Sequence, residues 1–223
     1  MSQRTALIVG ATGLVGGHCL QYLLQSDDYE KVIILVRRPL QMEHFKLAEH
    51  VVNFDKLDQY APVIIADDVY CCLGTTIKVA GSQEEFRKVD FTYTVQTCAI
   101  AVKNGADQLL VVTSLGANPH SRIFYNRIKG ETEEAVSKLP CEAIHFFRPS
   151  LLLGERKDSR RAEKAGISTI KGLSTMMVGP LKKYKPIEAT VVAHAMVLAA
   201  RESQPGVHIY ESDRIQALHE AEM

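Results

Sequence analysis

Residues 5–17 read TALIVGATGLVGG, an apolar run followed by three glycines at intervals of three, Gly10, Gly13 and Gly16. The apolar run predicts a buried strand, and the apolar residues after Gly13 predict a helix that begins at Leu14. In such a unit Gly10 allows the sharp turn, Gly13 lets a ligand approach the backbone and Gly16 lets the helix pack closely on the sheet. The spacing is G-x-x-G-x-x-G rather than G-x-G-x-x-G, so a purely structural turn is the alternative.

The start of the expected helix favours an anionic ligand. Free N–H groups and the positive end of the helix dipole would face the turn, and both stabilise a pyrophosphate. We therefore predict a dinucleotide site. The residues expected to contact the dinucleotide here are Gly10, Thr12, Gly13, Leu14, Val15 and Gly16.

The rest of the chain alternates short apolar runs with amphipathic stretches, which is typical of a parallel sheet flanked by helices. The expected strands are Thr5–Gly10, Lys31–Val36, His50–Asn53, Val69–Leu73, Gln108–Thr113, Glu142–Phe147 and Gly206–Tyr210. The expected helices are Leu14–Gln25, Gln41–Ala48, Lys56–Tyr60, Gln83–Asn104, Ser121–Leu139 and Ile187–Arg201. Right-handed crossovers turn such repeats into a doubly wound, Rossmann-type α/β fold.

We expect a single domain over residues 1–223, with one inserted segment and a loose end. Residues 150–186 are rich in glycine, proline and charge, and we predict that they form a lid or substrate-side extension. The last dozen residues are polar, and we expect them to fray.

The end of the second expected strand distinguishes two forms of the dinucleotide. An NAD site usually has an acidic residue there, which accepts hydrogen bonds from the ribose 2′-hydroxyl. This chain has Arg37 and Arg38 instead, and guanidinium groups pair with a 2′-phosphate. We therefore predict NADP(H) rather than NAD(H); a solvated arginine pair at a strand end is the alternative.

A tyrosine and a lysine, Tyr125 and Lys129, are four residues apart and so share one face of an expected helix. An ammonium group lowers the pKa of a nearby phenol, so Tyr125 could exchange a proton with a carbonyl or alcohol. Lys129 could also bind the nicotinamide ribose. Ser114 ends the fifth expected strand and is predicted to orient the substrate oxygen, with Thr113 as the alternative.

Composition excludes several other classes of function. The chain has 26 basic and 26 acidic residues, which argues against a nucleic-acid or anionic-membrane surface. The histidines lack metal-ligand spacing, so no metal site is predicted, and the five cysteines are expected to be reduced. The first apolar run is too short for a signal peptide, so we expect a cytoplasmic protein, either a monomer or a homodimer.

Together these residues resemble the short-chain dehydrogenase/reductase superfamily, in particular its atypical branch typified by the Tat-interacting protein family of NADP-binding, oxidoreductase-like proteins. The resemblance runs from Ala6 to about Ala200. Its motifs are GATGLVG (10–16), the pair Arg37-Arg38, VNFDKL (52–57), CCLGTT (71–76), Thr113-Ser114, Tyr125 with Lys129, and FRPSLLLG (147–154).

The resemblance implies further cofactor contacts. Asn53 and Phe54 would flank the adenine. Leu73, Gly74 and Thr75 would line the ribose and phosphates. Arg148, Pro149 and Ser150 would lie beside the nicotinamide.

Two departures from the superfamily pattern bear on catalysis rather than on cofactor binding. A superfamily asparagine that helps to relay protons is replaced by Asp90, and only 11 residues separate Ser114 from Tyr125. Two functions therefore stay open. One is an NADP(H)-dependent oxidoreductase acting on a small carbonyl or alcohol; the other is a non-catalytic NADP(H) sensor that acts through a protein partner.

Overall fold

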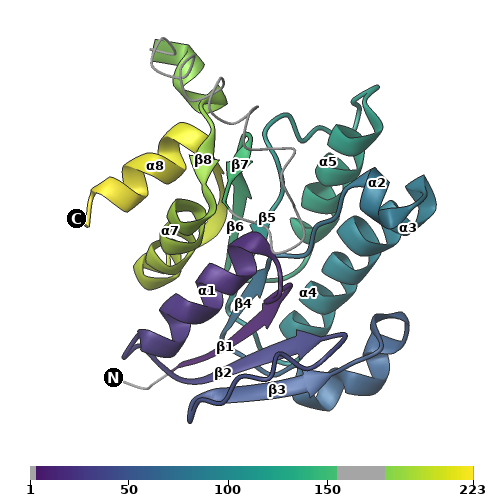
Figure 1. The fold of residues 1–223 in the computed structure, drawn as a ribbon, viewed down its shortest axis with the longest axis vertical. Helices are drawn as coiled ribbons and strands as arrows, with labels where there is room; N and C mark the ends of the chain where they lie inside the picture. Colours follow the sequence, from purple (N-terminus) through teal and green to yellow (C-terminus); the bar gives the residue numbers. More distant parts are fainter. Residues whose placement is uncertain (1–3, 155–178, 223) are drawn as a thin grey trace.

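The computed structural model describes residues 4–154 and 179–222, and they form an α/β structure around one seven-stranded sheet (Figure 1). All the strand pairs of this sheet are parallel, in the order β3-β2-β1-β4-β5-β6-β9. The strands are β1 (Arg4–Val9), β2 (Tyr29–Val36), β3 (Leu47–Val51), β4 (Asp68–Cys71), β5 (Gln108–Val112), β6 (Ala143–Arg148) and β9 (Gly206–Glu211). The prediction of a doubly wound, Rossmann-type sheet is confirmed.

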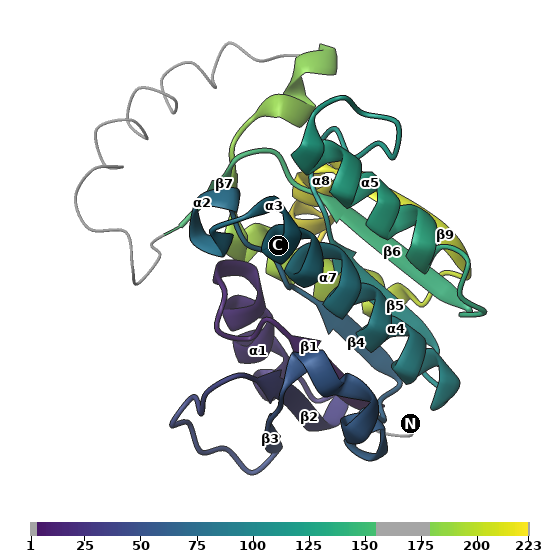
Figure 2. The same cartoon turned by 90° about the vertical axis from the view of Figure 1, so that its right-hand side faces the viewer.

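Helices cover both faces of the sheet, and Figure 2 shows the two layers from the side. One face carries α1 (Leu14–Gln25), α7 (Ala189–Glu202) and α8 (Ser212–Glu220). The other carries α4 (Thr94–Lys103), α5 (Phe124–Val136) and a 3₁₀ segment (Phe54–Val63). Along β1, Ala6 and Ile8 enter one core and Leu7 and Val9 the other, which is why residues 6–9 are all apolar.

The helix predicted over Gln41–Ala48 is wrong. Residues 41–46 are irregular, Gln41 has a φ of +55°, and Leu47 begins strand β3. Strand β3 pairs with β2 from Val32↔Leu47 to Val36↔Val51, so backbone pairing at the free edge of β2 outweighs the local helical pattern. The strand expected at His50–Asn53 therefore starts and ends earlier in the chain.

The long helix predicted over Gln83–Asn104 is present, but it is divided. It consists of α3 (Gln83–Arg87), a π-helical turn (Lys88–Tyr93) and α4, and the short helix α2 (Ile77–Ala80) precedes it. The short helix expected at Lys56–Tyr60 is part of the longer 3₁₀ segment.

The expectation that the chain end frays is wrong for Ser212–Glu220, which forms α8. Ile215 is fully buried, Leu218 packs on the core beside it, and the Ser212 hydroxyl accepts a hydrogen bond from the Ser150 N–H at 2.8 Å. Two apolar residues three apart are enough to hold this polar helix against α7.

The predicted segment 150–186 lies largely outside the described residues. Its described parts include β7 (Leu152–Leu153), which pairs with β8 (Ile187–Glu188), and a 3₁₀ turn (Gly179–Tyr184). In the portion of the chain that the structure describes, no helix combines the length and apolar character needed to cross a bilayer.

Candidate cofactor and active site

The turn between β1 and α1 requires glycine at two positions. Gly10 has a φ of +85°, and a Cβ there would lie 2.5 Å from the carbonyl oxygen of Cys72. A Cβ on Gly16 would lie 2.2 Å from the carbonyl oxygen of Gly10. The turn therefore packs against both β4 and its own helix at distances that exclude any side chain.

The N-terminus of α1 is open to a ligand. Gly13 precedes the helix without a side-chain cap, no acidic residue occupies the first turn, and both Thr12 and Gly13 are exposed. The helix N–H groups are therefore not blocked by a side chain, and the dipole favours an anion. A dinucleotide pyrophosphate fits this cradle.

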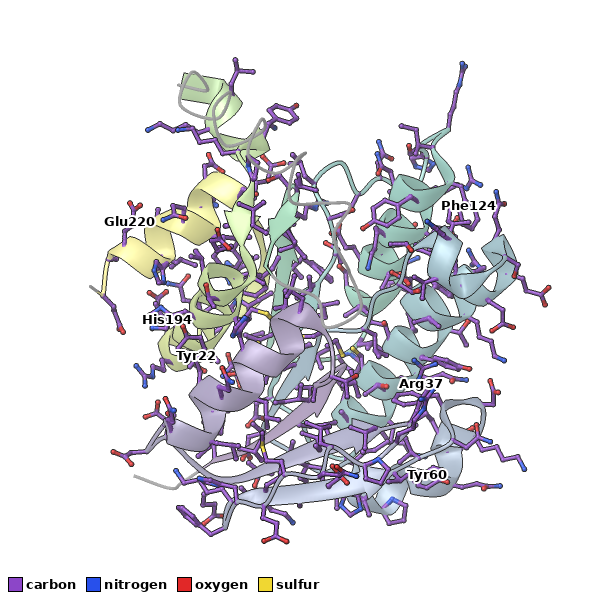
Figure 3. All side chains as sticks on the ribbon, viewed as in Figure 1. Tyr22, Arg37, Tyr60, Phe124, His194 and Glu220 are labelled. Atoms are coloured by element: carbon purple, nitrogen blue, oxygen red, sulfur yellow. The ribbon has the colours of Figure 1, made fainter. Side chains whose placement is uncertain are left out.

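The other predicted cofactor residues follow the carboxyl ends of neighbouring strands, so they lie along the same edge of the sheet. Arg37 and Arg38 come directly after β2, are exposed, and make no hydrogen bond or ion pair with any residue that the structure describes; Figure 3 labels Arg37. Asn53 is exposed after β3 and caps the Asp55 N–H at 3.0 Å. Phe54, by contrast, is buried against Tyr93, with ring centroids 5.4 Å apart.

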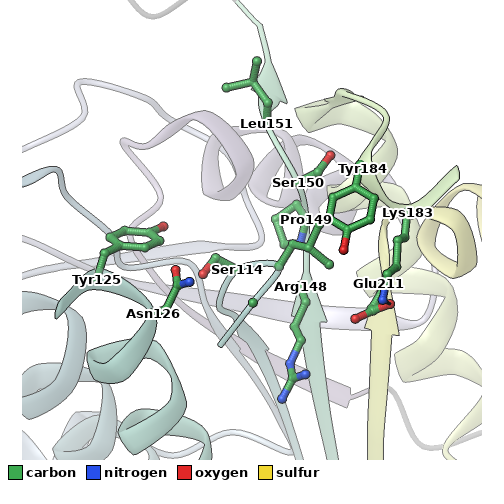
Figure 4. Close-up of a pocket in the computed structure, with 12 residues that line it drawn as sticks. Ser114, Tyr125, Asn126, Arg148, Pro149, Ser150, Leu151, Lys183, Tyr184 and Glu211 are labelled. Atoms are coloured by element: carbon green, nitrogen blue, oxygen red, sulfur yellow. Dashed lines mark ion pairs between the residues drawn. The ribbon is translucent and has the colours of Figure 1, made fainter. Parts of the chain in front are cut away.

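A pocket of about 580 Å³ opens beyond β5 and β6 (Figure 4). Its lining residues come from the β5–α5 loop, the start of α5, the segment after β6, the 3₁₀ turn near Tyr184 and the end of β9. They are Ser114, Leu115, Gly116, Tyr125, Asn126, Arg148, Pro149, Ser150, Leu151, Lys183, Tyr184 and Glu211. Two predicted catalytic residues, Ser114 and Tyr125, and two predicted nicotinamide neighbours, Arg148 and Pro149, thus share one pocket.

The two candidate hydroxyl groups at the end of β5 differ in their partners. Thr113 donates a hydrogen bond to Glu133 Oε1 at 2.5 Å, so its hydroxyl is already engaged. The Ser114 Oγ is buried, lines the pocket and has no hydrogen-bond partner within the described structure. Because an unpaired buried hydroxyl is costly, Ser114 is the better candidate to hold a substrate oxygen.

Lys129 is not among the residues that line the pocket; it is buried in an ion pair. Its Nζ is 2.7 Å from Asp90 Oδ1, and both side chains are almost completely buried. Burial alone would lower the pKa of Lys129, but the charges of Asp90 and of the Tyr125 phenol raise it above its ordinary value. The second oxygen of Asp90 accepts the Thr75 N–H at 3.0 Å, so the predicted cofactor loop at Leu73–Thr75 and Lys129 share one carboxylate.

Arg148 reaches the pocket with its charge already paired. Its Nε and Nη2 donate to Glu133 Oε1 and Oε2 at 2.9 and 2.5 Å. These hydrogen bonds raise the pKa of Arg148 and fix the guanidinium plane. Glu133 is buried and joins Arg148 to Thr113.

The role of Glu133 was not predicted from the sequence. The packing of the short loop between Ser114 and Tyr125 against α5 was not predicted either. Gly116 has a φ of +83°, and a Cβ on Gly130 would lie 2.2 Å from the backbone of Asn118 and Pro119. The loop thus packs directly onto α5 at Gly130. The glycine directly after Lys129, Gly130, was the available signal, whereas nothing in the pattern pointed to Glu133.

A family model and the curated relatives place this sequence in the same family. The family described as NAD(P)H-binding matches residues 10–138. Protein HTATIP2 from Rattus norvegicus is 35% identical over 167 residues, which cover 73% of this chain and 69% of that protein. The mitochondrial protein FMP52 from Eremothecium gossypii is 30% identical and covers 96% of both chains.

Solved structures share the fold at low sequence identity. MoeE5, in complex with UDP-glucose and NAD, superimposes with a TM-score of 0.70 at 15% identity, over 98% of this chain and 82% of that one. The oxidoreductase ylbE from Lactococcus lactis gives a TM-score of 0.67 at 17% identity, over 97% and 95%. At this identity the likeness supports the Rossmann-type fold alone.

Proposed function

Because the chain belongs to the NAD(P)H-binding family, in the atypical short-chain dehydrogenase/reductase group of the HTATIP2 and FMP52 proteins, we propose that it is an NADP(H)-dependent oxidoreductase. Its reaction would interconvert a small carbonyl and the corresponding alcohol. The observation that carries the proposal is the shared pocket, in which the unpaired Ser114 hydroxyl lies with Tyr125 at the carboxyl edge of the sheet.

The preference for NADP(H) over NAD(H) rests on Arg37 and Arg38. Both are exposed after β2 and have no partner among residues 4–154 and 179–222, so their charges are available to a 2′-phosphate. No acidic residue occupies the two positions where an NAD site would place one.

Each site residue then has a role. When bound, the reduced nicotinamide supplies the hydride. Tyr125 donates the proton to the carbonyl oxygen, because its hydroxyl makes no hydrogen bond within the part of the chain that the structure covers. Ser114 orients that oxygen, and Lys129 holds the ribose side of the cofactor in place.

The described lining favours an uncharged substrate. Arg148 is paired with Glu133, and Lys183 lies 3.1 Å from Glu211, so each of these cations already faces a carboxylate. A carboxylate or phosphate group on the substrate would have to compete with these pairs. A neutral aldehyde, ketone or quinone needs only the hydroxyl groups of Ser114 and Tyr125.

One observation favours a second function. The Asp90 carboxylate cancels the charge of Lys129, which is the group expected to activate Tyr125. A chain whose tyrosine is not activated by an unpaired lysine, and whose nucleotide cradle is intact, fits an NADP(H) sensor that reports to a protein partner. Either function is compatible with a monomer or a homodimer and with a cytoplasmic location, although yeast relatives are named mitochondrial.

The experiment that separates these functions is an NADPH-consumption assay with a panel of neutral aldehydes, ketones and quinones. The oxidoreductase predicts turnover that falls about 1000-fold in Tyr125→Phe with unchanged NADPH affinity. Tight NADPH binding without turnover on any panel member contradicts the oxidoreductase and favours the sensor.

A further inference from the structure

We propose that Asp90 is a positioning residue that sets the working pH of Tyr125 by neutralising Lys129. This inference rests on the proposed function, since it assigns Tyr125 the proton transfer. As a consequence of this neutralisation, Tyr125 keeps its proton to higher pH than it would beside an unpaired lysine. The site is thereby set for proton donation, which is carbonyl reduction, rather than for proton removal from an alcohol.

The geometry of the pair supports a full cancellation of charge. Lys129 Nζ and Asp90 Oδ1 are 2.7 Å apart, and the side chains are 5% and 0% exposed. Water therefore screens neither charge, and the two act on Tyr125 as a dipole rather than as a cation. Tyr125 and Lys129 interact electrostatically from one turn apart on α5. The Tyr125 phenol therefore experiences a weaker positive potential than it would beside an unpaired lysine.

The backbone around Asp90 is built to hold the carboxylate in this position. Asp90 lies in the π-helical turn Lys88–Tyr93, and such turns often occur at functional sites. The Thr132 hydroxyl of α5 shares its proton between the carbonyl oxygen of Ile128 at 2.8 Å and that of Asp90 at 3.1 Å. The bond to Asp90 ties the turn to the helix that carries Tyr125 and Lys129.

The same carboxylate also touches the predicted cofactor loop. Its Oδ2 accepts the Thr75 N–H at 3.0 Å, and a Cβ on Gly74 would lie 3.8 Å from both Asp90 Oδ1 and Lys129 Nζ. The ion pair thus forms the floor beneath residues 74 and 75.

The other charges near the pair do not replace its effect. Glu133 is one turn further along α5 and is paired with Arg148 of β6. Charged groups on the outer surface of α5 and of the adjoining turns also have partners. These surface pairs are Arg87 and Arg127 with Glu131, Lys138 with Glu134, and Lys88 with Asp55 of the 3₁₀ segment.

The test measures the ionisation of Tyr125 in variants that remove the charge of Asp90 alone or the charges of both Asp90 and Lys129. The chain is labelled with tyrosine carrying ¹³C at Cζ, and Tyr125→Phe identifies the Tyr125 resonance. The pH midpoint of its ionisation is then measured in the wild type, in Asp90→Asn and in the double variant Asp90→Asn/Lys129→Met. Asparagine keeps an oxygen to accept the Thr75 N–H, so the loop retains its support.

The proposal predicts a midpoint about one pH unit lower in Asp90→Asn than in the wild type. The double variant, which has neither charge, returns to within about half a unit of the wild type. The high-pH limb of kcat/KM moves with the midpoint, because a proton donor loses activity once it is deprotonated. A merely structural role for Asp90 would lower stability without moving either.

Two results would overturn the proposal. One is an Asp90→Asn midpoint equal to the wild type. The other, which needs only the double variant to fold, is a double-variant midpoint about one unit above the wild type, because that is the signature of an unscreened Lys129. Neither readout requires turnover, so an absence of NADPH oxidation contradicts the proposed function and leaves this test intact.

Discussion

The two ends of the sheet both carry buried charge, and they use it differently. At the amino end, Asp68 is buried, and each of its oxygens has a partner: Arg4 and Tyr29 on Oδ2 at 2.6 and 2.5 Å, and Gln108 on Oδ1 at 2.9 Å. Arg4 and Gln108 also donate to the carbonyl oxygen of Ala200 in α7. This cluster ties four strands to a helix.

At the carboxyl end the hydrogen bonding is left incomplete. Lys129 and Asp90 form a closed pair, but the Ser114 hydroxyl beside them has no partner inside the described ranges, and the same is true of Tyr125. The Asp68 carboxylate is fully hydrogen-bonded within the fold, although the neighbouring Gln108 Oε1 has no partner in the described structure. Ser114 and Tyr125, by contrast, line a pocket, so their unpaired hydroxyl groups are available to a ligand. The comparison predicts that damage to one end affects stability and damage to the other affects ligand binding.

The largest effect is expected from breaking the amino-end cluster. Asp68→Ala should lower the free energy of unfolding by about 3 kcal/mol, because Arg4, Tyr29 and Gln108 lose their shared acceptor. NADPH affinity should not change. Chemical denaturation measures the loss, with Asp27→Ala as the control, since Asp27 is exposed and makes no polar contact with the described residues; an equal loss in both variants would contradict this role.

Next in size is the effect of closing the cofactor turn. Gly16→Ala places a methyl group 2.2 Å from the carbonyl oxygen of Gly10, and we expect NADPH binding to weaken about 100-fold. Gly17→Ala is the matched control on the same helix, because its methyl group meets only Ala11 at an ordinary 3.5 Å. Fluorescence titration measures the NADPH affinity of both variants. Equal affinities would contradict binding of the pyrophosphate at the β1–α1 turn.

Some features of the carboxyl end could be predicted from sequence because they depend on local spacing. The β1–α1 turn was predictable because its requirement is local: three glycines within seven residues between a strand and a helix. That Ser114 and Tyr125 line one pocket was predictable, because the end of a strand and the start of the next helix lie at one edge of the sheet; their catalytic roles, and that of Lys129, stay predictions.

Long-range partners were not predictable. Nothing near Lys129 in the sequence indicates that its charge meets Asp90, which is 39 positions away, or that Glu133 joins Thr113 to Arg148. The start of strand β3 and the whole of helix α8 were mispredicted for the same reason. Their stability comes from pairing with β2 and packing on α7, not from local propensity.

A smaller effect should appear as a pH dependence at the amino end. Burial raises the pKa of Asp68 to about 6, despite the opposing charge of Arg4. The folded state thus holds this proton more tightly than the unfolded chain does. The associated stability is present in full below about pH 4 and is lost as the pH rises through 6, a change on the order of 2 kcal/mol by pH 7. Denaturation of wild type and Asp68→Asn from pH 4 to 7 measures it; parallel curves would contradict it.

The smallest effect separates the two hydroxyl groups at the end of β5. Ser114→Ala should lower kcat/KM about 10-fold and leave the melting temperature unchanged, since the hydroxyl has no partner in the described structure. Thr113→Val should instead cost about 1 kcal/mol of stability, because it removes the hydrogen bond to Glu133. A reversal of these two outcomes would make Thr113 the substrate-orienting residue.

The most direct test of the account is a titration of the wild type and of Arg37→Ala/Arg38→Ala with NADPH and NADH. Because the two guanidinium groups are expected to pair with the 2′-phosphate, the wild type should bind NADPH about 100-fold more tightly than NADH. The double variant should lose this preference and keep its affinity for NADH. Equal affinities in the wild type would contradict an NADP(H) site, and binding of neither nucleotide would mean that the glycines at residues 10–16 form only a turn.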